Sequence, residues 1–535
     1  MPETGSNLPL RDYHQVRASL LARDEIALLD VREEAPHAEG HPLFATNLPL
    51  SRLELLAYTK LPRRDVPIVT IDSGEGFAEL AAQRLQAMGY TDVAVFKGGI
   101  DGWKAAGGEL FIDVNVPSKA FGELVESVCH TPSMPAEDVQ ALIDSGEDCI
   151  LVDARRFDEY QTMTIPGSIS VPGAELALRV PEMAPNAKTK VIVHCAGRTR
   201  SLVGTQSLIN FGLPNQVHAL RNGTIGWTLA RQKLALGQSR RYPENPGAAA
   251  AASARKARSV ADRAGVKRVA PDAVRQWSAQ EGRTTYFFDV RSPEEYAHGH
   301  LPGFLSIPGG QLVQELEMYA PVRGARIVLC DTDGVRANMT ASWLAQMAWD
   351  VFVVDGFDAA DFSESGVPKA PLPTVPRNET VSASDLATWL ADGDTVVIDV
   401  ARHAAFRKGH IPGAWFLIRS LLPASVPHLP KARRYVVTCP DGMFAPFVAP
   451  ELAETMQADV VVLEGGNSAW TAAGHSLEGG ETRLASPPID RYRRPYEGTD
   501  VPDSAMQAYL DWEFGLVAQL ERDGTHHFKP MTSSH

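Results

Sequence analysis

The sequence predicts an α/β protein built from four copies of one parallel-sheet domain. An apolar run that ends in an aspartate occurs four times, and a second apolar run ends 40 to 42 residues after each aspartate. Helix-like segments alternate with these runs. Short apolar runs are typical of buried strands, and strands that alternate with helices over about a hundred residues indicate a parallel sheet. A repeat in phase therefore accounts for most of the chain.

The first repeated element is a strand that ends in an aspartate, followed closely by an arginine. We expect Asp153 and Arg155 to form an ion pair that organises the loop, because the same pair recurs at Asp289 and Arg291. A Pro-Gly turn follows in three copies, and its glycine stands fourteen residues after the aspartate. The first copy departs from this pattern over residues 40–44. The aspartates are Asp30, Asp153, Asp289 and Asp399, and the turn glycines are Gly167, Gly303 and Gly413.

The second repeated strand leads into a polar loop and then a helix. Its last residue is Ile71 in the first copy and a cysteine in the other three. The helices are expected over residues 78–88, 201–210, 337–347 and 449–456. A further strand ends each copy, and Trp103, Trp227 and Trp470 follow it in three copies. We interpret Trp227 as a packing anchor.

The repeat defines the predicted domains. They span residues 5–112, 133–238, 266–372 and 379–482, with a helical tail over 483–535. Residues 239–265 contain an alanine run and then basic residues, which we interpret as a linker with a solvated helix. Within the tail, residues 506–520 have apolar side chains at helical spacing. We expect this helix to dock on the last domain, and a dimer contact is the alternative.

Composition narrows the class of protein. The chain has 535 residues, 44% of them hydrophobic and 22% charged, as in soluble globular proteins. The net charge of −14 argues against nucleic-acid binding, and no apolar stretch is long enough to span a membrane. The N-terminus has no signal-peptide pattern. Five cysteines without a CxxC pair predict neither a disulfide scaffold nor a zinc site, so we expect a cytoplasmic protein with free thiols and no cofactor or metal.

Three cysteines occupy one slot of the repeat, at the junction of a buried strand and the loop that opens a helix. They are Cys195, Cys330 and Cys439, whereas Cys149 is expected in the core and Cys129 in a joint between copies. Unpaired N–H groups at such a junction bind anions and lower the pKa of a thiol.

The loops after the three cysteines differ in charge. The loop after Cys195 contains Arg198 and Arg200 and no acidic residue, and Ser201 is placed to cap the helix. The loop after Cys330 contains two aspartates and one arginine, and the loop after Cys439 contains a proline and an aspartate. Acidic neighbours raise the pKa of a thiol. The sequence therefore favours Cys195 as the nucleophile and leaves Cys330 and Cys439 as secondary thiols.

These motifs resemble the rhodanese family of sulfurtransferases over residues 5–482. The resemblance rests on the Asp-x-Arg strand end, the Pro-Gly turn, the cysteine loop and the Gly-Gly-x-x-x-Trp ending. It implies four domains, each a five-stranded parallel sheet flanked by helices. It also implies a catalytic Cys195 that cycles through a persulfide, with the first, third and fourth loops degraded. Substrate contacts fall on the residues of the second loop, namely Gly197, Arg198, Thr199, Arg200 and Ser201.

The reaction expected from this loop moves sulfur in two steps. The thiolate of Cys195 attacks the outer sulfur of thiosulfate, sulfite leaves, and cyanide or a thiol then removes the sulfur. Arg198 and Arg200 bind the charge of the donor, or Arg200 braces the loop. Two alternatives stay open. One is phosphatase or arsenate-reductase chemistry at Cys330, which stands at Cys-x5-Arg spacing from Arg336. The other is a scaffold or sulfur relay with a protein persulfide acceptor.

Overall fold

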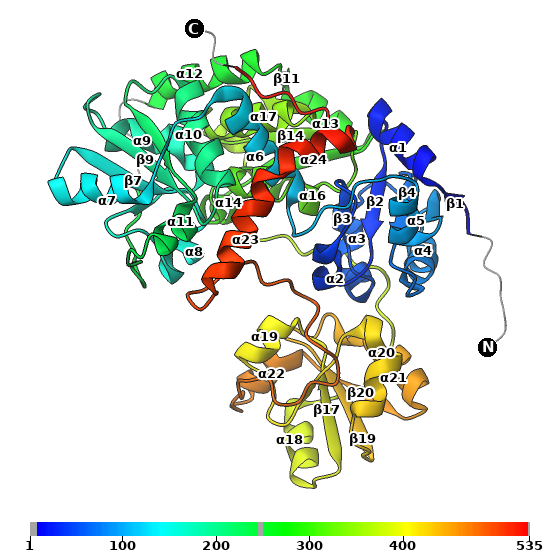
Figure 1. Cartoon of the computed structure of the whole chain (residues 1–535). Coiled ribbons are helices and arrows are strands. Elements are labelled where there is room, and N and C mark those ends of the chain that lie inside the picture. Colours follow the sequence, from blue (N-terminus) through cyan, green and yellow to red (C-terminus); the bar gives the residue numbers. More distant parts are fainter. Residues whose placement is uncertain (1–7, 244–249, 533–535) are drawn as a thin grey trace.

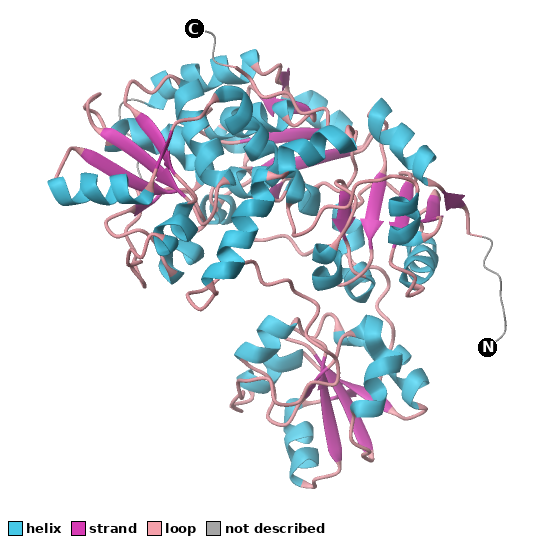
Figure 2. Ribbon diagram, in the orientation of Figure 1, coloured by secondary structure: helices cyan, strands magenta, loops and turns pink. Residues whose placement is uncertain are grey.

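The structure is a computed structural model that describes residues 8–243 and 250–532, and within these residues it contains four sheets of five strands (Figures 1 and 2). The strand order in every sheet is first, fifth, fourth, second, third, and all neighbours are parallel. The predicted fold class of four five-stranded parallel sheets flanked by helices is confirmed.

The strands follow the apolar runs of the sequence. The first sheet contains β1 (Leu10–Arg11), β2 (Ala27–Asp30), β3 (Ala45–Asn47), β4 (Ile68–Ile71) and β5 (Val93–Phe96); the second contains β6 (Ser133–Met134), β7 (Cys149–Asp153), β8 (Ile169–Ser170), β9 (Lys190–His194) and β10 (Val217–Leu220). The third contains β11 (Lys267–Val269), β12 (Thr285–Asp289), β13 (Leu305–Ser306), β14 (Arg326–Cys330) and β15 (Asp350–Val354); the fourth contains β16 (Thr380–Val381), β17 (Thr395–Asp399), β18 (Trp415–Phe416), β19 (Arg434–Thr438) and β20 (Val460–Leu463).

Helices connect the strands in the same order in each domain. The first two domains contain α1 (Tyr13–Ala22), α2 (Glu34–Glu39), α3 (Leu53–Lys60), α4 (Phe77–Ala87), α5 (Gly99–Ala105), α7 (Ala136–Ser145), α8 (Phe157–Thr162), α9 (Leu176–Met183), α10 (Thr199–Phe211) and α11 (Gly223–Leu229). The last two contain α13 (Pro271–Ser278), α14 (Pro293–His298), α15 (Gly309–Gln314), α16 (Leu316–Tyr319), α17 (Arg336–Gln346), α18 (Ala383–Ala391), α19 (His403–Lys408), α20 (Leu422–Ser425), α21 (Ala445–Met456) and α22 (Gly466–Ala472). Outside the domains lie α6 (Val116–Cys129), α12 (Ala250–Arg263), α23 (Asp503–Phe514) and α24 (Leu516–Asp523).

Strand register brings the repeated polar residues to one edge of each sheet. Asp153 pairs with His194, the residue before Cys195, and Asp289 pairs with Cys330. Because the strands are parallel, their carboxyl ends share this edge, where open α/β sheets bind ligands. The aspartate loop and the cysteine loop are therefore neighbours in every copy.

The tryptophan after the last strand is a core residue in three domains. Trp103, Trp227 and Trp470 are buried, and each indole N–H donates to a backbone carbonyl six residues later over 3.0 Å. This burial agrees with the interpretation of Trp227 as a packing anchor. In the third domain a single 3₁₀ turn at Ala359–Asp361 stands where the other copies have this helix.

The first three domains pack together, and the fourth lies apart from them beside the first (Figure 1). A single apolar cluster joins the first and third domains, which also form a bridge between Ile26 and Arg323. The fourth domain is tied to the first by ion pairs, among them Arg419 with Glu54 at 2.6 Å.

The linker and the tail differ from their predictions. Helix α12 exists and one of its faces is exposed, but the other face is not solvated, because Ala257 and Val260 are buried beside α9, α10 and α17. The first two residues of the alanine run, 248 and 249, lie outside the described residues, and the rest of the run opens α12. The tail folds into α23 and α24 rather than one helix. Both pack against α6 and not on the fourth domain, so the predicted docking site is wrong. Helix α6 is buried on several sides, and α23 and α24 cover part of its surface.

No helix in the described ranges is both long and apolar enough to cross a membrane.

Candidate active site

Cys195 stands between the end of β9 and the start of α10, as the repeat predicts. Its side chain is buried, and its Sγ lies 3.5 Å from the hydroxyl of Ser201. Helix α11 holds the loop of Cys195 in place, because the N–H of Thr224 donates to the carbonyl of Cys195 over 2.9 Å. Gly223 has φ +53°, and a Cβ there would lie 2.3 Å from that same carbonyl oxygen. The loop thus depends on a glycine for its close contact with α11.

The predicted low pKa of Cys195 is wrong. Burial raises the pKa of this thiol above its ordinary value, although the charge of Arg200 and hydrogen bonds from Ser201 act in the opposite direction. Glu513 of the tail raises the pKa further. The sequence argument considered the N–H groups and the charges of the loop but not desolvation, which has the largest effect on this pKa in the folded chain.

Arg198 is held by carboxylates of α6. Its guanidinium donates to both oxygens of Glu123 over 2.7 and 2.9 Å, and it also contacts Glu126. The ring of Phe514 lies against it at 4.2 Å. The sequence predicted that Arg198 binds the negative charge of the sulfur donor. In the structure the carboxylates of α6 neutralise the charge of Arg198 instead.

Arg200 forms a bidentate ion pair with Glu159 of α8. The two contacts are 2.7 and 2.9 Å. The third domain repeats this pair as Arg336 with Glu295, at 2.6 and 2.7 Å. Because the pair recurs in a loop of different sequence, it supports the bracing role that the sequence left open for Arg200.

Gly197 and Thr199 of the second loop contact helices α23 and α6, which lie outside the four domains. A Cβ on Gly197 would lie 3.2 Å from Tyr509 and 3.4 Å from Glu513, both on α23. Thr199 packs against Gly122 of α6. Ser201 lies inside α10 rather than at its cap, and its hydroxyl donates to the carbonyl of Arg198 over 2.7 Å. Helices α6 and α23 therefore contact the loop, and α15 of the third domain lines a further cavity together with Thr199 and Arg200.

Asp153 and Arg155 form the expected ion pair beside this loop. Arg155 donates to the carboxylate over 2.7 and 2.9 Å and also to the carbonyl of Met163. Burial alone would raise the pKa of Asp153, but the charges of Arg155 and His194 hold it below its ordinary value. The pair recurs at Asp289 and Arg291, which supports a structural role.

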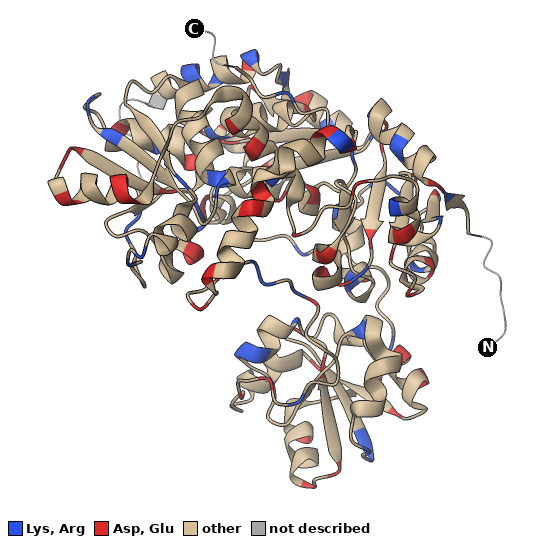
Figure 3. Ribbon diagram, in the orientation of Figure 1, with Lys and Arg blue, Asp and Glu red and all other residues tan. Residues whose placement is uncertain are grey.

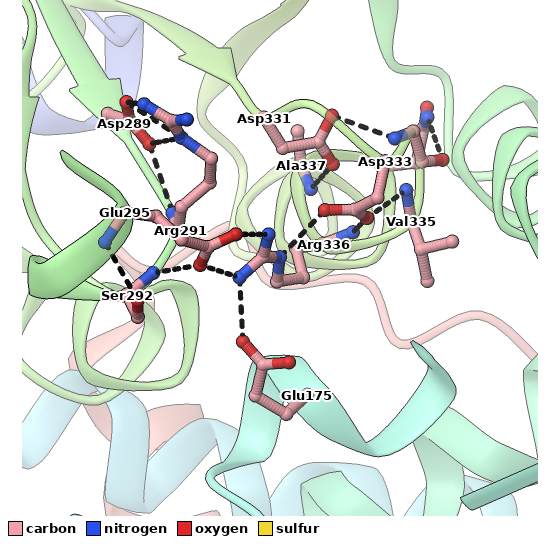
Figure 4. Close-up of polar contacts among 12 residues, drawn as sticks. Glu175, Asp289, Arg291, Ser292, Glu295, Asp331, Asp333, Val335, Arg336 and Ala337 are labelled. Carbon is pink, nitrogen blue, oxygen red and sulfur yellow. Dashed lines mark hydrogen bonds and ion pairs between the residues drawn. The ribbon is translucent and has the colours of Figure 1, made fainter. Parts of the chain in front are cut away.

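The loop of Cys330 is filled by its own acidic residues (Figure 4). Asp331 accepts hydrogen bonds from the N–H groups of Gly334 at 2.9 Å and Ala337 at 2.7 Å. Arg336 contacts three carboxylates, those of Glu175, Asp333 and Glu295. Burial first, and then the charge of Asp289, raise the pKa of Cys330 well above its ordinary value. The N–H groups of residues 334–337 all donate to Asp331 or Asp333, and the guanidinium of Arg336 is paired with carboxylates, which argues against the phosphatase alternative.

The loop of the first domain is filled in the same way. Asp72 accepts hydrogen bonds from the N–H groups of Gly74 and Ala78, both at 3.1 Å. Asp72 and Asp331 each stand one residue after the cysteine slot. Ala196 holds this position in the second domain, so no carboxylate of that residue fills the loop.

Cys439 has backbone N–H groups close to its sulfur that the sequence analysis did not predict. The N–H groups of Phe444 and Ala445 each lie 3.4 Å from its sulfur, where they can stabilise a thiolate. Burial nevertheless raises the pKa of Cys439. The loop contains no arginine, but Arg52 of the first domain lies over the ring of Phe444 at 4.2 Å. This contact between distant segments has no local sequence signal.

A cavity of about 560 Å³ lies among the domains. Side chains from all four domains and the tail line it, and charged groups of both signs are present. Arg200 and Glu159 belong to its wall, so the brace of the second loop faces this space.

The sheets, the cysteine loop and the closing tryptophan helix define a protein made of rhodanese-like domains. The family model for the rhodanese-like domain matches residues 14–106, 135–230, 270–358 and 382–473, and the chain therefore belongs to this family.

One solved structure is similar to the whole chain. It is a thiosulfate sulfurtransferase from Pseudomonas aeruginosa, 59% identical, with a TM-score of 0.97; the match covers 98% of this chain and 100% of that one. Curated relatives match single domains. A putative sulfur carrier protein of Bacillus subtilis is 29% identical over 91 residues, which are 16% of this chain and 49% of that protein. An uncharacterized protein of Synechococcus elongatus is 36% identical over 73 residues, which are 12% of this chain and 45% of that protein. The chain spans about half the length of these two curated relatives.

Proposed function

We propose that this protein is a thiosulfate sulfurtransferase in which the second domain carries the reaction on Cys195. The observation that carries the proposal is the contrast among homologous loops. The first loop has no cysteine, and Asp331 occupies the amides beside Cys330, whereas Ala196 leaves the position beside Cys195 open. The rhodanese family and the similar solved structure support sulfurtransferase activity in general.

In the first step, the thiolate of Cys195 attacks the outer sulfur of thiosulfate. A bond forms between the two sulfur atoms, the bond to the sulfonate sulfur breaks, and its electron pair leaves with sulfite. The product is an anionic persulfide on Cys195, which the N–H of Ser201 and the charge of Arg200 stabilise. Because the pKa of the thiol is raised, a proton must leave before attack, and we expect the rate to increase with pH.

In the second step, a nucleophile attacks the outer sulfur of the persulfide. With cyanide the products are thiocyanate and the Cys195 thiolate; with a thiol they are a new persulfide and the same thiolate. No cofactor or metal takes part in this scheme. We propose that the protein is cytoplasmic and that domains 5–112, 266–372 and 379–482 serve mainly as scaffold around the catalytic domain, 133–238, and the tail, 483–535.

The test is thiosulfate:cyanide sulfur transfer by the full chain and by Cys195→Ser, Cys330→Ser and Cys439→Ser. We expect Cys195→Ser to abolish thiocyanate formation and the other two variants to retain most of it. Mass spectrometry after thiosulfate treatment should find one added sulfur atom on the peptide of Cys195. An added sulfur on Cys330 or Cys439 instead, or full activity of Cys195→Ser, would overturn the assignment.

A further inference from the structure

Helix α23 of the tail carries a buried carboxyl group that faces the loop of Cys195. Glu513 is fully buried, with 0% of its surface exposed. Its Oε1 accepts a hydrogen bond from Tyr509 over 2.8 Å, and its Oε2 has no hydrogen-bond partner in the described part of the chain. That unpartnered oxygen lies 3.4 Å from the position of a Cβ on Gly197. Buried polar atoms are normally paired, so this exception calls for an explanation.

We propose that α23 completes the sulfur-transfer site of the second domain, and that Glu513, in its protonated form, donates a hydrogen bond from Oε2 to the anion held at the Cys195 loop. This inference rests on the function proposed above and extends it to the tail. The site accepts a dianion such as thiosulfate while Glu513 is protonated and therefore neutral. As a carboxylate, it would repel the same dianion and oppose ionisation of Cys195.

The groups around Glu513 favour its neutral form. Tyr509 lies on its own helix, Lys119 and Glu123 come from α6, and Arg198 and Cys195 come from the second loop. Burial raises the pKa of Glu513 to about 8; the charge of Glu123 adds to this effect, whereas Lys119, Tyr509 and Arg198 oppose it. The two cations cannot restore an ordinary acidity, because Asp113 pairs with Lys119 at 2.7 Å and Glu123 pairs with Arg198. Tyr496, from the segment before α23, lies beside Tyr509 with 5.4 Å between ring centroids.

Oε2 is the oxygen placed to donate. Since Oε1 already accepts the proton of Tyr509, the acid proton of Glu513 can point from Oε2 toward the loop without losing an internal hydrogen bond. Gly197 makes this approach feasible, because any larger residue would contact Tyr509 and Glu513. The loop thus combines a residue without a side chain with an unpartnered carboxyl group opposite it.

The experiment measures persulfide formation on the full chain by rapid mixing with thiosulfate between about pH 6 and pH 10. This range includes both the raised pKa of Glu513 and the ordinary pKa of a thiol. In the wild type, the logarithm of the rate should rise as the thiol ionises and then level near pH 8 as Glu513 loses its proton. In Glu513→Gln the rate should continue to rise through that pH. Tyr509→Phe, which removes a hydrogen bond that favours the carboxylate, should move the break to higher pH.

The matched control is Asp511→Asn on the same helix, where the carboxylate is exposed (Figure 3 shows the acidic residues of α23). Its profile should match the wild type. An unchanged break in Glu513→Gln would overturn the role of Glu513 while leaving Cys195 as the nucleophile. Loss of transfer in the wild type itself, or transfer by Cys195→Ser, would instead contradict the proposed function.

A second measurement needs neither activity nor a folded variant. The measurement compares how fast neutral iodoacetamide and anionic iodoacetate alkylate Cys195, quantified by peptide mass spectrometry. If Glu513 becomes negatively charged beside the loop, it slows the anionic reagent more than the neutral one. The rate with iodoacetamide divided by the rate with iodoacetate should therefore increase about threefold to tenfold in the wild type from pH 7 to pH 9, the effect of one added charge at short range in partly buried surroundings. A constant ratio would overturn the proposal.

Discussion

Asp72 and Asp331, in the first and third domains, occupy equivalent positions and close equivalent loops. Asp72 accepts a hydrogen bond from the N–H of Ala78 at 3.1 Å, and Asp331 accepts one from the N–H of Ala337 at 2.7 Å. In each case a carboxylate of the protein takes donors that would otherwise be available to an anion. The corresponding residue of the second domain is Ala196, which makes the difference between open and filled loops testable by one substitution.

Ala196→Asp should close the loop of Cys195 as Asp331 closes that of Cys330. We expect the rate of sulfite release from thiosulfate to fall by about 100-fold or more, because loop N–H donors are lost to the anion and a negative charge is added. Ala196→Ser is the matched control, since it adds a polar side chain without charge and should retain activity within about tenfold, the effect of roughly 1.4 kcal/mol. Equal losses in both variants would show that any side chain at this position is harmful, and the charge argument would fail.

The fold was predictable from the sequence because each copy repeats the same local signals. An apolar run, an aspartate and a Pro-Gly turn at fixed spacing report strands and turns without any knowledge of distant contacts. The cysteine slot was found for the same reason. The electrostatics were predicted less well, because the loop of Cys195 contains no acid in sequence but meets Glu123, Glu159 and Glu513 in space.

These acidic residues come from three separate helices, α6, α8 and α23. Glu159 could have been found from the sequence, because it stands six residues after Asp153 as Glu295 stands after Asp289. Glu123 and Glu513 lie outside the repeat and have no counterpart in another copy. Their positions depend on how the interdomain helix and the tail pack, which is a tertiary property that no local pattern reports.

Glu123→Ala should destabilise the chain more than Glu126→Ala. Both carboxylates contact Arg198, but the side chain of Glu123 is 4% exposed and that of Glu126 is 28% exposed. Removing the buried partner leaves a buried guanidinium without full compensation, at a cost of about 3 kcal/mol or more. Removing the more exposed partner should cost about 1 kcal/mol or less.

Urea unfolding at neutral pH, followed by tryptophan fluorescence, would measure this difference, since α6 packs near Trp343 and Trp512. If the two variants lose the same stability, the pair between Arg198 and Glu123 does not anchor α6 on the loop.

Gly223→Ala should reduce sulfur transfer strongly by displacing the loop of Cys195. A Cβ at Gly223 would lie 2.3 Å from the carbonyl oxygen of Cys195, so the loop or α11 must move. Gly237→Ala is the control, because Gly237 also has a positive φ, +65°, but no atom within 4 Å of the added Cβ. Both variants carry the backbone strain of about 1 kcal/mol, and only Gly223→Ala adds the clash.

We expect kcat/KM for thiosulfate to fall at least about tenfold in Gly223→Ala, since small misplacements of reacting groups are costly, and to stay near the wild-type value in Gly237→Ala. A similar kcat/KM in the two variants would mean that α11 does not set the position of the loop.

The raised pKa of Glu513 predicts how stability depends on pH. In the folded chain this group keeps its proton up to about pH 8, compared with an ordinary value of 4.5. Between these two values the folded state binds a proton that the unfolded state releases, so the contribution of Glu513 to the free energy of unfolding decreases as pH rises and becomes constant above the folded pKa. Glu513→Gln has no such group. Its stability relative to the wild type should therefore increase between about pH 5 and pH 8, and Asp511→Asn should show no such trend. Thermal unfolding at both pH values, followed by the tryptophan fluorescence of the whole chain, measures the difference in Tm between variant and wild type. A difference that is the same at both pH values would show that Glu513 ionises normally in the folded protein.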